Sequence, residues 1–336
     1  MLTLQDAPHV FAPLAAARGL VLAVSGGPDS VALMLLAAHW PGRPPMTVAT
    51  VDHGLRTKSA AEAETMGRWA AALGLPHQIL VWHGEKPESR IQERAREARY
   101  ALLLACAVAT GADAIVTAHH ADDQAETILF RLLRGSGPAG LAGMRAAQPR
   151  GGVTQWRPLL DYPKADLVAL CARAGHPWFD DPSNRNENFA RPRQRRLGPL
   201  LAAQGVDRTA ILRLGHRAAR AEAALDDMAQ RLAPDWPIQR SAGQSVAPAA
   251  ALVQMPAEIA QRLLAREILH ISGARAPLRL ERLERASASL SAAVAAQTAF
   301  AASLGGVVVR LDRAGVLRLC PESPRRRGRN PAPDPD

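Results

Sequence analysis

Short apolar segments alternate with helix-forming segments between residues 20 and 134, and this alternation constrains the fold more than any other feature of the chain. Each apolar segment has the length of a buried strand, and each segment between two of them is long enough for a helical crossover. Strands joined in this way run parallel, through right-handed crossovers, in a sheet that is covered on both faces. The sequence therefore predicts an α/β fold with a doubly wound parallel sheet. The predicted strands are 20–24, 46–51, 77–82 and 114–118, and the predicted helices are 29–38, 60–73, 88–110 and 122–134.

The second half of the chain has a different character. Residues 175–199 contain four prolines and little apolar periodicity, which indicates an extended linker. Beyond the linker, helical patterns separated by Pro256 and Pro277 predict a smaller, mostly helical domain that ends in a hairpin over residues 307–319. We expect a sheet domain at 1–184, a basic linker at 185–204, the helical domain at 205–320 and a disordered tail at 321–336.

Composition excludes several classes of protein. Aromatic residues make up only 4% of the 336 residues, which disfavours an aromatic-packed β-sandwich. No apolar run approaches the roughly 18 residues that a membrane span needs, and residues 1–13 resemble neither a secretory signal nor a transit peptide. Cys106, Cys171 and Cys320 are far apart, so they offer neither a disulfide framework nor a paired-thiol site. We expect a cytoplasmic protein without a membrane partner.

The basic charge is concentrated in a small part of the chain. The net charge is +10, yet residues 1–184 are neutral, with 17 basic and 17 acidic side chains. Residues 185–220 hold 9 basic and 2 acidic side chains, and every one of these bases is arginine. A solvated basic helix is one interpretation. A local strip of guanidinium groups is also typical of a surface that binds phosphates, so a polyanionic partner is the interpretation we favour.

A glycine-containing loop after the first predicted strand is the most informative motif. Two glycines allow a tight turn with outward-facing N–H groups, and the start of the next helix adds the positive end of its dipole. This arrangement predicts an anion site, although the loop lacks the lysine of a Walker motif. An ordinary capped turn is the alternative. The loop residues are Ser25, Gly26, Gly27, Pro28, Asp29 and Ser30.

This loop resembles the PP-loop of the ATP-pyrophosphatase superfamily, whose members cleave ATP between the α and β phosphates. The resemblance implies the corresponding fold, similar to adenine nucleotide α-hydrolases, and an ATP-binding role for all six loop residues and for His53. It also implies that Asp29 helps to hold Mg²⁺. ATP and Mg²⁺ are therefore the expected cofactors, and a metal-bound carboxylate with backbone donors would stabilise departing pyrophosphate.

Further motifs narrow the resemblance to one family. The segments 51–56 and 117–127 follow the second and fourth predicted strands, at the edge of the sheet where ligands bind in parallel α/β folds. Together with segments 95–100 and 131–137, they resemble the tRNA(Ile)-lysidine synthetases. That family is a group of carbon–nitrogen ligases that join L-lysine to the wobble cytidine of tRNA(Ile) with a CAU anticodon, so that the tRNA reads AUA as isoleucine. The resemblance implies a catalytic, ATP-binding first domain, a tRNA-contacting second domain and a homodimer.

The acidic cluster after the fourth strand allows more than one interpretation. Asp123 and Glu126 share a helix face and could hold a cationic substrate. Acids favoured by the helix dipole are a second interpretation, and a zinc site formed with His119 and His120 is a third. The family resemblance assigns Asp123 and Glu126 to lysine binding.

Arginines complete the predicted site. The candidate catalytic residues are Asp29, Arg99, Asp123 and Glu126. Arg99 and Arg131 are the candidates to neutralise phosphate or to hold the base. The identity of the base that deprotonates the lysine amine stays open. The candidate tRNA-binding residues are Arg131, Arg134, Arg191, Arg193, Arg195 and Arg196.

Two other functions share parts of this pattern. A tRNA thiolation enzyme would pass through the same adenylate, but such enzymes commonly use paired cysteines, which this chain lacks. A non-catalytic RNA-binding module with a nucleotide fold would not need Asp29 and the acidic cluster. We therefore expect an adenylating ligase.

Overall fold

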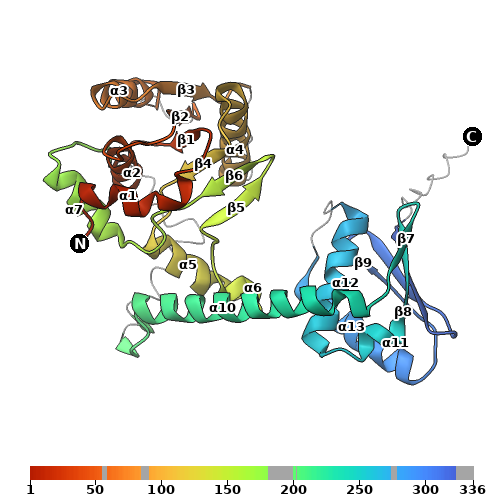
Figure 1. The fold of residues 1–336 in the computed structure, drawn as a ribbon. Coiled ribbons are helices and arrows are strands. Elements are labelled where there is room, and N and C mark those ends of the chain that lie inside the picture. Colours follow the sequence, from red (N-terminus) through yellow and green to blue (C-terminus); the bar gives the residue numbers. More distant parts are fainter. Residues whose placement is uncertain (55–58, 85–90, 181–199, 202, 274–277, 323–336) are drawn as a thin grey trace, which may run out of the picture. The chain divides into compact units, whose positions relative to one another are not determined.

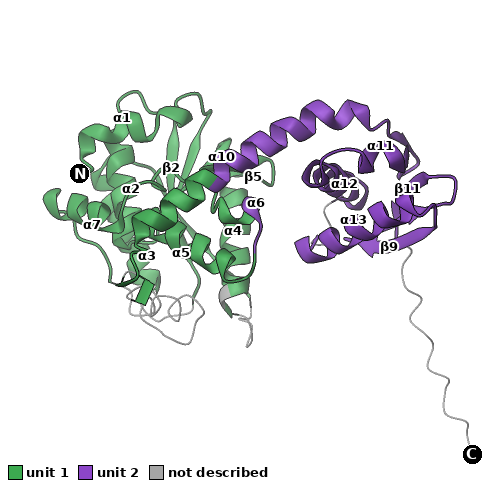
Figure 2. Ribbon diagram, turned by 90° about the horizontal axis from the view of Figure 1, so that it is seen from below, with its two compact units in different colours: residues 1–135, 140–217 green, residues 136–139, 218–336 purple. Residues whose placement is uncertain are grey.

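The computed structural model describes residues 1–54, 59–84, 91–180, 200–201, 203–273 and 278–322. The chain divides into two compact units, coloured in Figure 2. Unit 1 comprises residues 1–135 and 140–217, and unit 2 comprises residues 136–139 and 218–336. The boundary at 217 falls within a single long helix, α10 (Arg208–Leu232).

Unit 1 contains a six-stranded sheet in the order β3-β2-β1-β4-β6-β5 (Figure 1). All neighbouring strands pair in parallel except β5, which pairs antiparallel with β6 at one edge. The predicted doubly wound parallel sheet is thereby confirmed, and the order of the strands reverses between β1 and β4. The strands are β1 (Leu20–Ala23), β2 (Met46–Asp52), β3 (His77–Val81), β4 (Ala114–Thr117), β5 (Ala147–Arg150) and β6 (Val153–Trp156).

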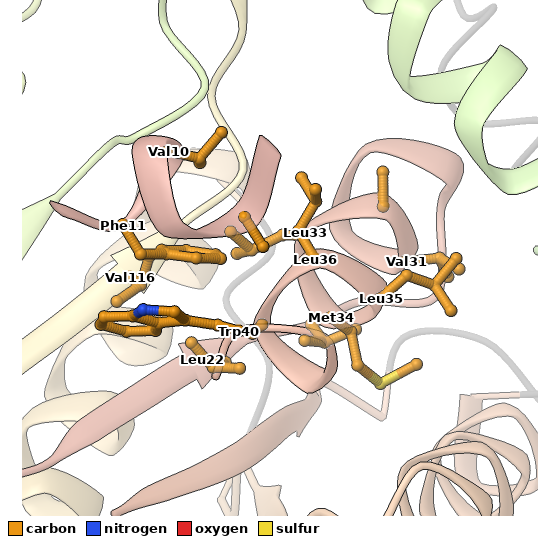
Figure 3. Packing of buried hydrophobic residues seen from close by; sticks show 14 of the residues in the cluster. Val10, Phe11, Leu22, Val31, Leu33, Met34, Leu35, Leu36, Trp40 and Val116 are labelled. Carbon is orange, nitrogen blue, oxygen red and sulfur yellow. The ribbon is translucent and has the colours of Figure 1, made fainter. Parts of the chain in front are cut away.

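Helices cover both faces of this sheet because its central strands are apolar on both sides. Leu20 and Leu22 face a core shared with α2 (Pro28–Ala38), α3 (Ser59–Ala72) and α7 (Lys164–Arg173). Val21, between them, faces the opposite core, which is formed with α4 (Ile91–Thr110). The N-terminal turns seal the first core, where Phe11 stacks on Trp40 with ring centroids 5.1 Å apart (Figure 3). These turns are η1 (Leu4–Asp6), α1 (Ala7–Val10) and η2 (Ala12–Leu14).

Two further helices, α5 (Ala121–Leu132) and α6 (Pro138–Leu141), follow β4. Gln124 of α5 is buried, and its side chain exchanges two hydrogen bonds with the backbone of Met144, at 2.7 and 3.0 Å. This pair of bonds fixes the segment after α5 against the helix.

Unit 2 combines helices with a five-stranded antiparallel sheet in the order β7-β8-β11-β10-β9. The terminal hairpin predicted from sequence is present as β10 and β11, and the helices do separate near the two prolines. The remaining strands of this sheet had not been predicted. The elements are η4 (Ala233–Asp235), β7 (Gln239–Ser241), β8 (Gln244–Pro248), α11 (Ala249–Val253), α12 (Ala257–Ser272), α13 (Leu280–Ala295), β9 (Phe300–Leu304), β10 (Val307–Leu311) and β11 (Val316–Pro321).

Candidate active site

The loop between β1 and α2 is shaped by the hydroxyl of Ser30. This buried oxygen accepts hydrogen bonds from the backbone N–H groups of Ser25 and Gly26, each at 3.1 Å, and donates to the carbonyl of Gly27 at 2.9 Å. Ser30 therefore closes the loop from inside. The first N–H groups of α2 have no acceptor within an α-helix, so they are available to an anion at this helix end.

Gly26 is required at its position for two reasons. Its φ of +89° disfavours any residue with a Cβ, and an added Cβ would lie 2.3 Å from the ring of Phe179. Phe179 donates its backbone N–H to the carbonyl of Gly26 at 2.8 Å and stacks on Trp69. Gly27 differs, because a Cβ there would meet no atom within 4 Å. The loop is thus anchored at Gly26 and open at Gly27.

His120 joins the loop to the acidic cluster across the point where the strand order reverses. Its ring nitrogen Nε2 lies 3.4 Å from Oδ2 of Asp29 and 3.5 Å from Oδ2 of Asp123. Its Nδ1 accepts the backbone N–H of Asp123 at 3.3 Å, and Asp123 Oδ2 accepts the backbone N–H of His120 at 3.2 Å. His120 is thereby the N-cap of α5, in a reciprocal capping arrangement. One ring holds two carboxylates from distant parts of the chain.

The start of α7 completes this arrangement. Asp122 accepts the backbone N–H of Lys164 at 2.8 Å and a hydrogen bond from Arg208 at 2.8 Å. The ammonium of Lys164 lies 3.6 Å from Oδ2 of Asp29. Asp29 is therefore flanked by His120 and Lys164, and Asp122 fixes the helix that presents Lys164.

The surroundings of Asp122 and Asp123 shift the pKa values of these two neighbouring carboxyl groups in opposite directions. Burial, with smaller contributions from Glu126 and Asp29, raises the pKa of Asp123 against the opposing effect of His120. Burial would also raise the pKa of Asp122, but its bonds with Lys164 and Arg208 lower it overall. Burial disfavours protonated His120, but the hydrogen bond with Asp29 and the surrounding carboxylates outweigh burial and raise its pKa. The raised pKa of Asp123 and the lowered pKa of Asp122 mean that Asp123 accepts a proton more readily than Asp122 does.

One atom of Asp29 fits a cation. Its Oδ1 is buried and makes no hydrogen bond, although Oδ2 faces His120 and Lys164. A buried carboxylate oxygen without a donor is costly, and carboxylate oxygen is a ligand that Mg²⁺ prefers. The described residues contain no group of three or more His, Cys, Asp or Glu side chains arranged to hold a metal by themselves. Asp29 could thus share a metal with phosphate oxygens.

The other predicted site residues lie in different surroundings. Glu126 is partly buried, one helical turn after Asp123, and His53 follows β2 with its ring edge-on to Trp82 at 6.0 Å. Arg99 is exposed on α4. Residues 191–196, which include four of the predicted tRNA-binding arginines, lie outside the described residues.

The two predicted arginines on α5 and beyond it differ from each other. Arg131 is half-buried and donates to the carbonyls of Gly140 and Gly143 at 2.9 and 2.7 Å, and burial lowers its pKa. Arg134 is exposed, with its guanidinium 4.1 Å from the centre of the Phe130 ring. Arg131 therefore holds the chain after α5 in place, whereas Arg134 faces solvent.

Two residues of the site were not selected from the sequence. His120 was considered only as a metal ligand, although its position directly before a helix with Asp three residues later is a capping signal. Lys164 belongs to an ordinary helical pattern, and no local signal indicates that it approaches Asp29.

The chain is similar to known proteins along most of its length. Residues 3–201 match the family model described as the PP-loop domain. The chain is 52% identical over 314 residues to the tRNA(Ile)-lysidine synthase of Methylobacterium sp. (strain 4-46), covering 93% of this chain and 91% of that protein. It is 44% identical over 350 residues to the tRNA(Ile)-lysidine synthase of Bradyrhizobium diazoefficiens, covering 96% and 95%. The chain belongs to the tRNA(Ile)-lysidine synthase family.

A solved structure supports the fold. The U34-tRNA thiolase NcsA from Methanococcus maripaludis, described with its [4Fe-4S] cluster, aligns with a TM-score of 0.53 at 14% identity, covering 64% of this chain and 77% of that chain. At this identity the likeness extends to the fold alone. Within the described residues, no helix has the length and apolar character to cross a membrane.

Proposed function

We propose that this chain ligates L-lysine to the wobble cytidine of tRNA(Ile) with a CAU anticodon, using ATP. Family membership supports this reaction. The structural observation that supports it best is the meeting of Asp29, from the glycine-containing loop, with Asp123, from α5, around the single ring of His120. Asp29 would act on the nucleotide phosphates through Mg²⁺, and Asp123 would hold a cationic amine.

In the first step, the 2-oxo oxygen of cytosine attacks the α-phosphorus of ATP, and pyrophosphate leaves. The open backbone at Gly27 and the start of α2 would bind the departing phosphates. Asp29 would hold Mg²⁺ through Oδ1, and that ion would offset the charge on pyrophosphate when bound. Lys164 would add a second positive charge beside Asp29.

In the second step, the lysine ε-amine attacks C2 of the activated base, and AMP leaves with the oxygen that it acquired. The attacking amine must lose a proton, so a carboxylate that accepts one readily is useful. Burial raises the pKa of Asp123, and Glu126 lies close enough to contribute to that shift. We assign Asp123 as the proton acceptor and Glu126 as its partner in holding the amine.

The tRNA would reach this site through the exposed arginines of unit 1. Arg134 is one such residue. In this proposal, Arg191, Arg193, Arg195 and Arg196 of the arginine-rich strip also bind tRNA phosphates. Arg99 would neutralise phosphate near the target base. A homodimer is part of the same proposal, and light scattering in solution tests it.

The test is to incubate the protein with labelled lysine, ATP and bulk tRNA. We expect label in the RNA, with one AMP and one pyrophosphate formed per lysine. Omitting lysine should prevent the release of AMP, whereas a thiolation enzyme would not require lysine to release AMP. Formation of ADP instead of pyrophosphate would contradict the proposal, and tRNA binding without transfer would favour a non-catalytic module.

A further inference from the structure

A group of arginines surrounds Tyr100 on the α4 side of the sheet. The guanidinium of Arg150, at the end of β5, lies 3.9 Å from the centre of the Tyr100 ring, and that of Arg96 lies 5.4 Å away. Arg157, directly after β6, is close enough to Tyr100 and Arg150 for their charges to affect its pKa. Arg99 directly precedes Tyr100 on α4 and follows Arg96 by about one helical turn. We call Arg96, Arg99, Arg150 and Arg157 the Tyr100 cluster.

Within the described residues, no member of this cluster pairs with a carboxylate. Arg157 is 3% exposed, and its bonds go to the carbonyl of Arg145 and the amide of Gln148, while its Nε has no acceptor. Burial lowers the pKa of Arg157, and the nearby Arg150 and Arg96 act in the same direction. Placing like charges together with one of them buried is unfavourable unless an anion offsets them.

The cluster is connected to the active site by hydrogen bonds. Gln155, fully buried on β6, donates through Nε2 to the hydroxyl of Tyr100 at 2.9 Å and to Thr117 at 3.2 Å. Thr117 ends β4, and its hydroxyl lies 2.9 Å from Nδ1 of His119. His119 directly precedes His120. A chain of hydrogen bonds therefore runs from Tyr100 of the cluster to the residue before the N-cap of α5.

We propose that the Tyr100 cluster binds a backbone phosphate of single-stranded RNA, next to the nucleotide that reacts. This inference rests on the proposed function, which it extends to a site on the RNA. Guanidinium groups bind phosphate oxygens in a bidentate manner, which suits them to the backbone of RNA. In the proposed function, the nucleotide phosphates bind at the loop after β1, and β1 and β6 lie on opposite sides of β4. An RNA phosphate is therefore the anion that fits this position.

The test compares tRNA binding by the wild type and by Arg150→Gln, Arg96→Gln and the double variant at several salt concentrations. Each lost phosphate contact should reduce the slope of log affinity against log salt by about 1. We expect roughly tenfold weaker tRNA binding for the double variant at moderate salt, with the KM values for ATP and lysine unchanged. Arg150→Lys should restore most of the slope because it keeps the charge.

Arg43→Gln is the matched control. Arg43 lines a cavity of about 560 Å³ at the amino-terminal ends of the strands, the edge opposite the active site. Removal of its charge should leave the slope as in the wild type. Thermal melting identifies any variant that fails to fold. If Arg150→Gln does, the exposed Arg96→Gln decides the question.

Two results would overturn the inference. One is an unchanged salt slope in folded Arg96→Gln and Arg150→Gln variants, and the other is a raised KM for ATP with unaltered tRNA binding, which would assign the cluster to a nucleotide phosphate. Failure of the proposed function is a separate outcome. A wild-type protein that binds tRNA and transfers no lysine would disprove the ligation, while the binding slopes would still decide the cluster.

Discussion

The two units differ in whether the charged side chains described here have partners of opposite charge. In unit 2, Arg262 is largely buried and bonds to Glu222 at 2.6 and 2.7 Å, to Glu258 at 2.9 Å and to Asp226 at 3.1 Å. In unit 1, Asp29 keeps a buried oxygen without a donor, and the Tyr100 cluster has no described carboxylate partner. The charges of the Arg262 network in unit 2 are paired within the protein, whereas Asp29 Oδ1 and the Tyr100 cluster of unit 1 have no partner of opposite charge among the described residues. This difference separates residues that stabilise the protein from residues that act on substrate.

The largest expected effect is on catalysis, from the substitution Asp29→Asn. We expect lysine-dependent AMP release to fall roughly 100-fold or more, because the charge that would hold the metal is lost. The melting temperature should change little, since the wild-type carboxylate is incompletely satisfied. Asp161→Asn, which alters an exposed carboxylate 3.4 Å from His216, is the control and should retain full activity. A strongly destabilised but active Asp29→Asn protein would contradict the distinction between the two units.

The next effect is on stability, from Arg262→Met in unit 2. Removing this guanidinium leaves three carboxylates near one another, at a cost of about 3 kcal/mol. Hydrogen exchange of α12 amides, followed by mass spectrometry, should accelerate strongly, while exchange in the unit 1 sheet stays unchanged. Arg231→Met breaks an exposed pair with Asp227 at 2.9 Å and should cost below about 0.5 kcal/mol. Equal exchange in both variants would show that burial of the Arg262 network adds nothing to stability.

The same contrast explains what could be predicted from sequence. Strands β1 to β4 were predicted to within one residue at each end, because each contains several apolar residues and is bounded by turns. Strands β5 and β7 were missed because they are short and largely exposed, and β5 also contains Pro149. The apolar pattern of residues 200–232 also indicates a helix, and the structure has helical residues at 200, 201 and 203 and then α10 from Arg208, after a turn that contains Gly205.

Some features of the active site could likewise be predicted from sequence, and others could not. The loop around Gly26 and Asp29 is a local motif, so its position after β1 followed from the sequence. The approach of Lys164 to Asp29 and of Arg208 to Asp122 joins residues more than 80 positions apart, and nothing near either residue indicates the partner. The Tyr100 cluster likewise requires the pairing of β5 with β6. Such contacts depend on tertiary packing and were therefore absent from the prediction.

The contribution of Glu267, in unit 2, to the stability of the protein should depend on pH. Its carboxylate is buried, which alone would raise its pKa, but hydrogen bonds from Arg240 and Ser245 lower the pKa overall. A carboxyl with a lowered pKa in the folded state stabilises the protein above its unfolded pKa, and this contribution disappears as the pH falls through the folded value. Wild type should therefore melt several degrees above Glu267→Gln at pH 7, and the difference should shrink below about pH 4.5. A difference that is constant with pH would refute this assignment.

The smallest effect expected is that of Lys164→Met. This substitution tests whether the charge of Lys164 contributes to stability or to catalysis. The ammonium of Lys164 is 47% exposed and 3.6 Å from Asp29, so its loss should change stability by less than about 0.5 kcal/mol. Lys164→Met should nevertheless lower kcat for adenylation roughly tenfold if the ammonium offsets phosphate charge in the transition state. Lys164→Arg keeps the charge and should retain most of the activity. If Lys164→Met instead raised only the KM for ATP, the ammonium would contribute equally to ground-state and transition-state binding. If Lys164→Met left kcat unchanged but lowered the stability, Lys164 would have a structural role like that of Arg262 and no role in binding substrate.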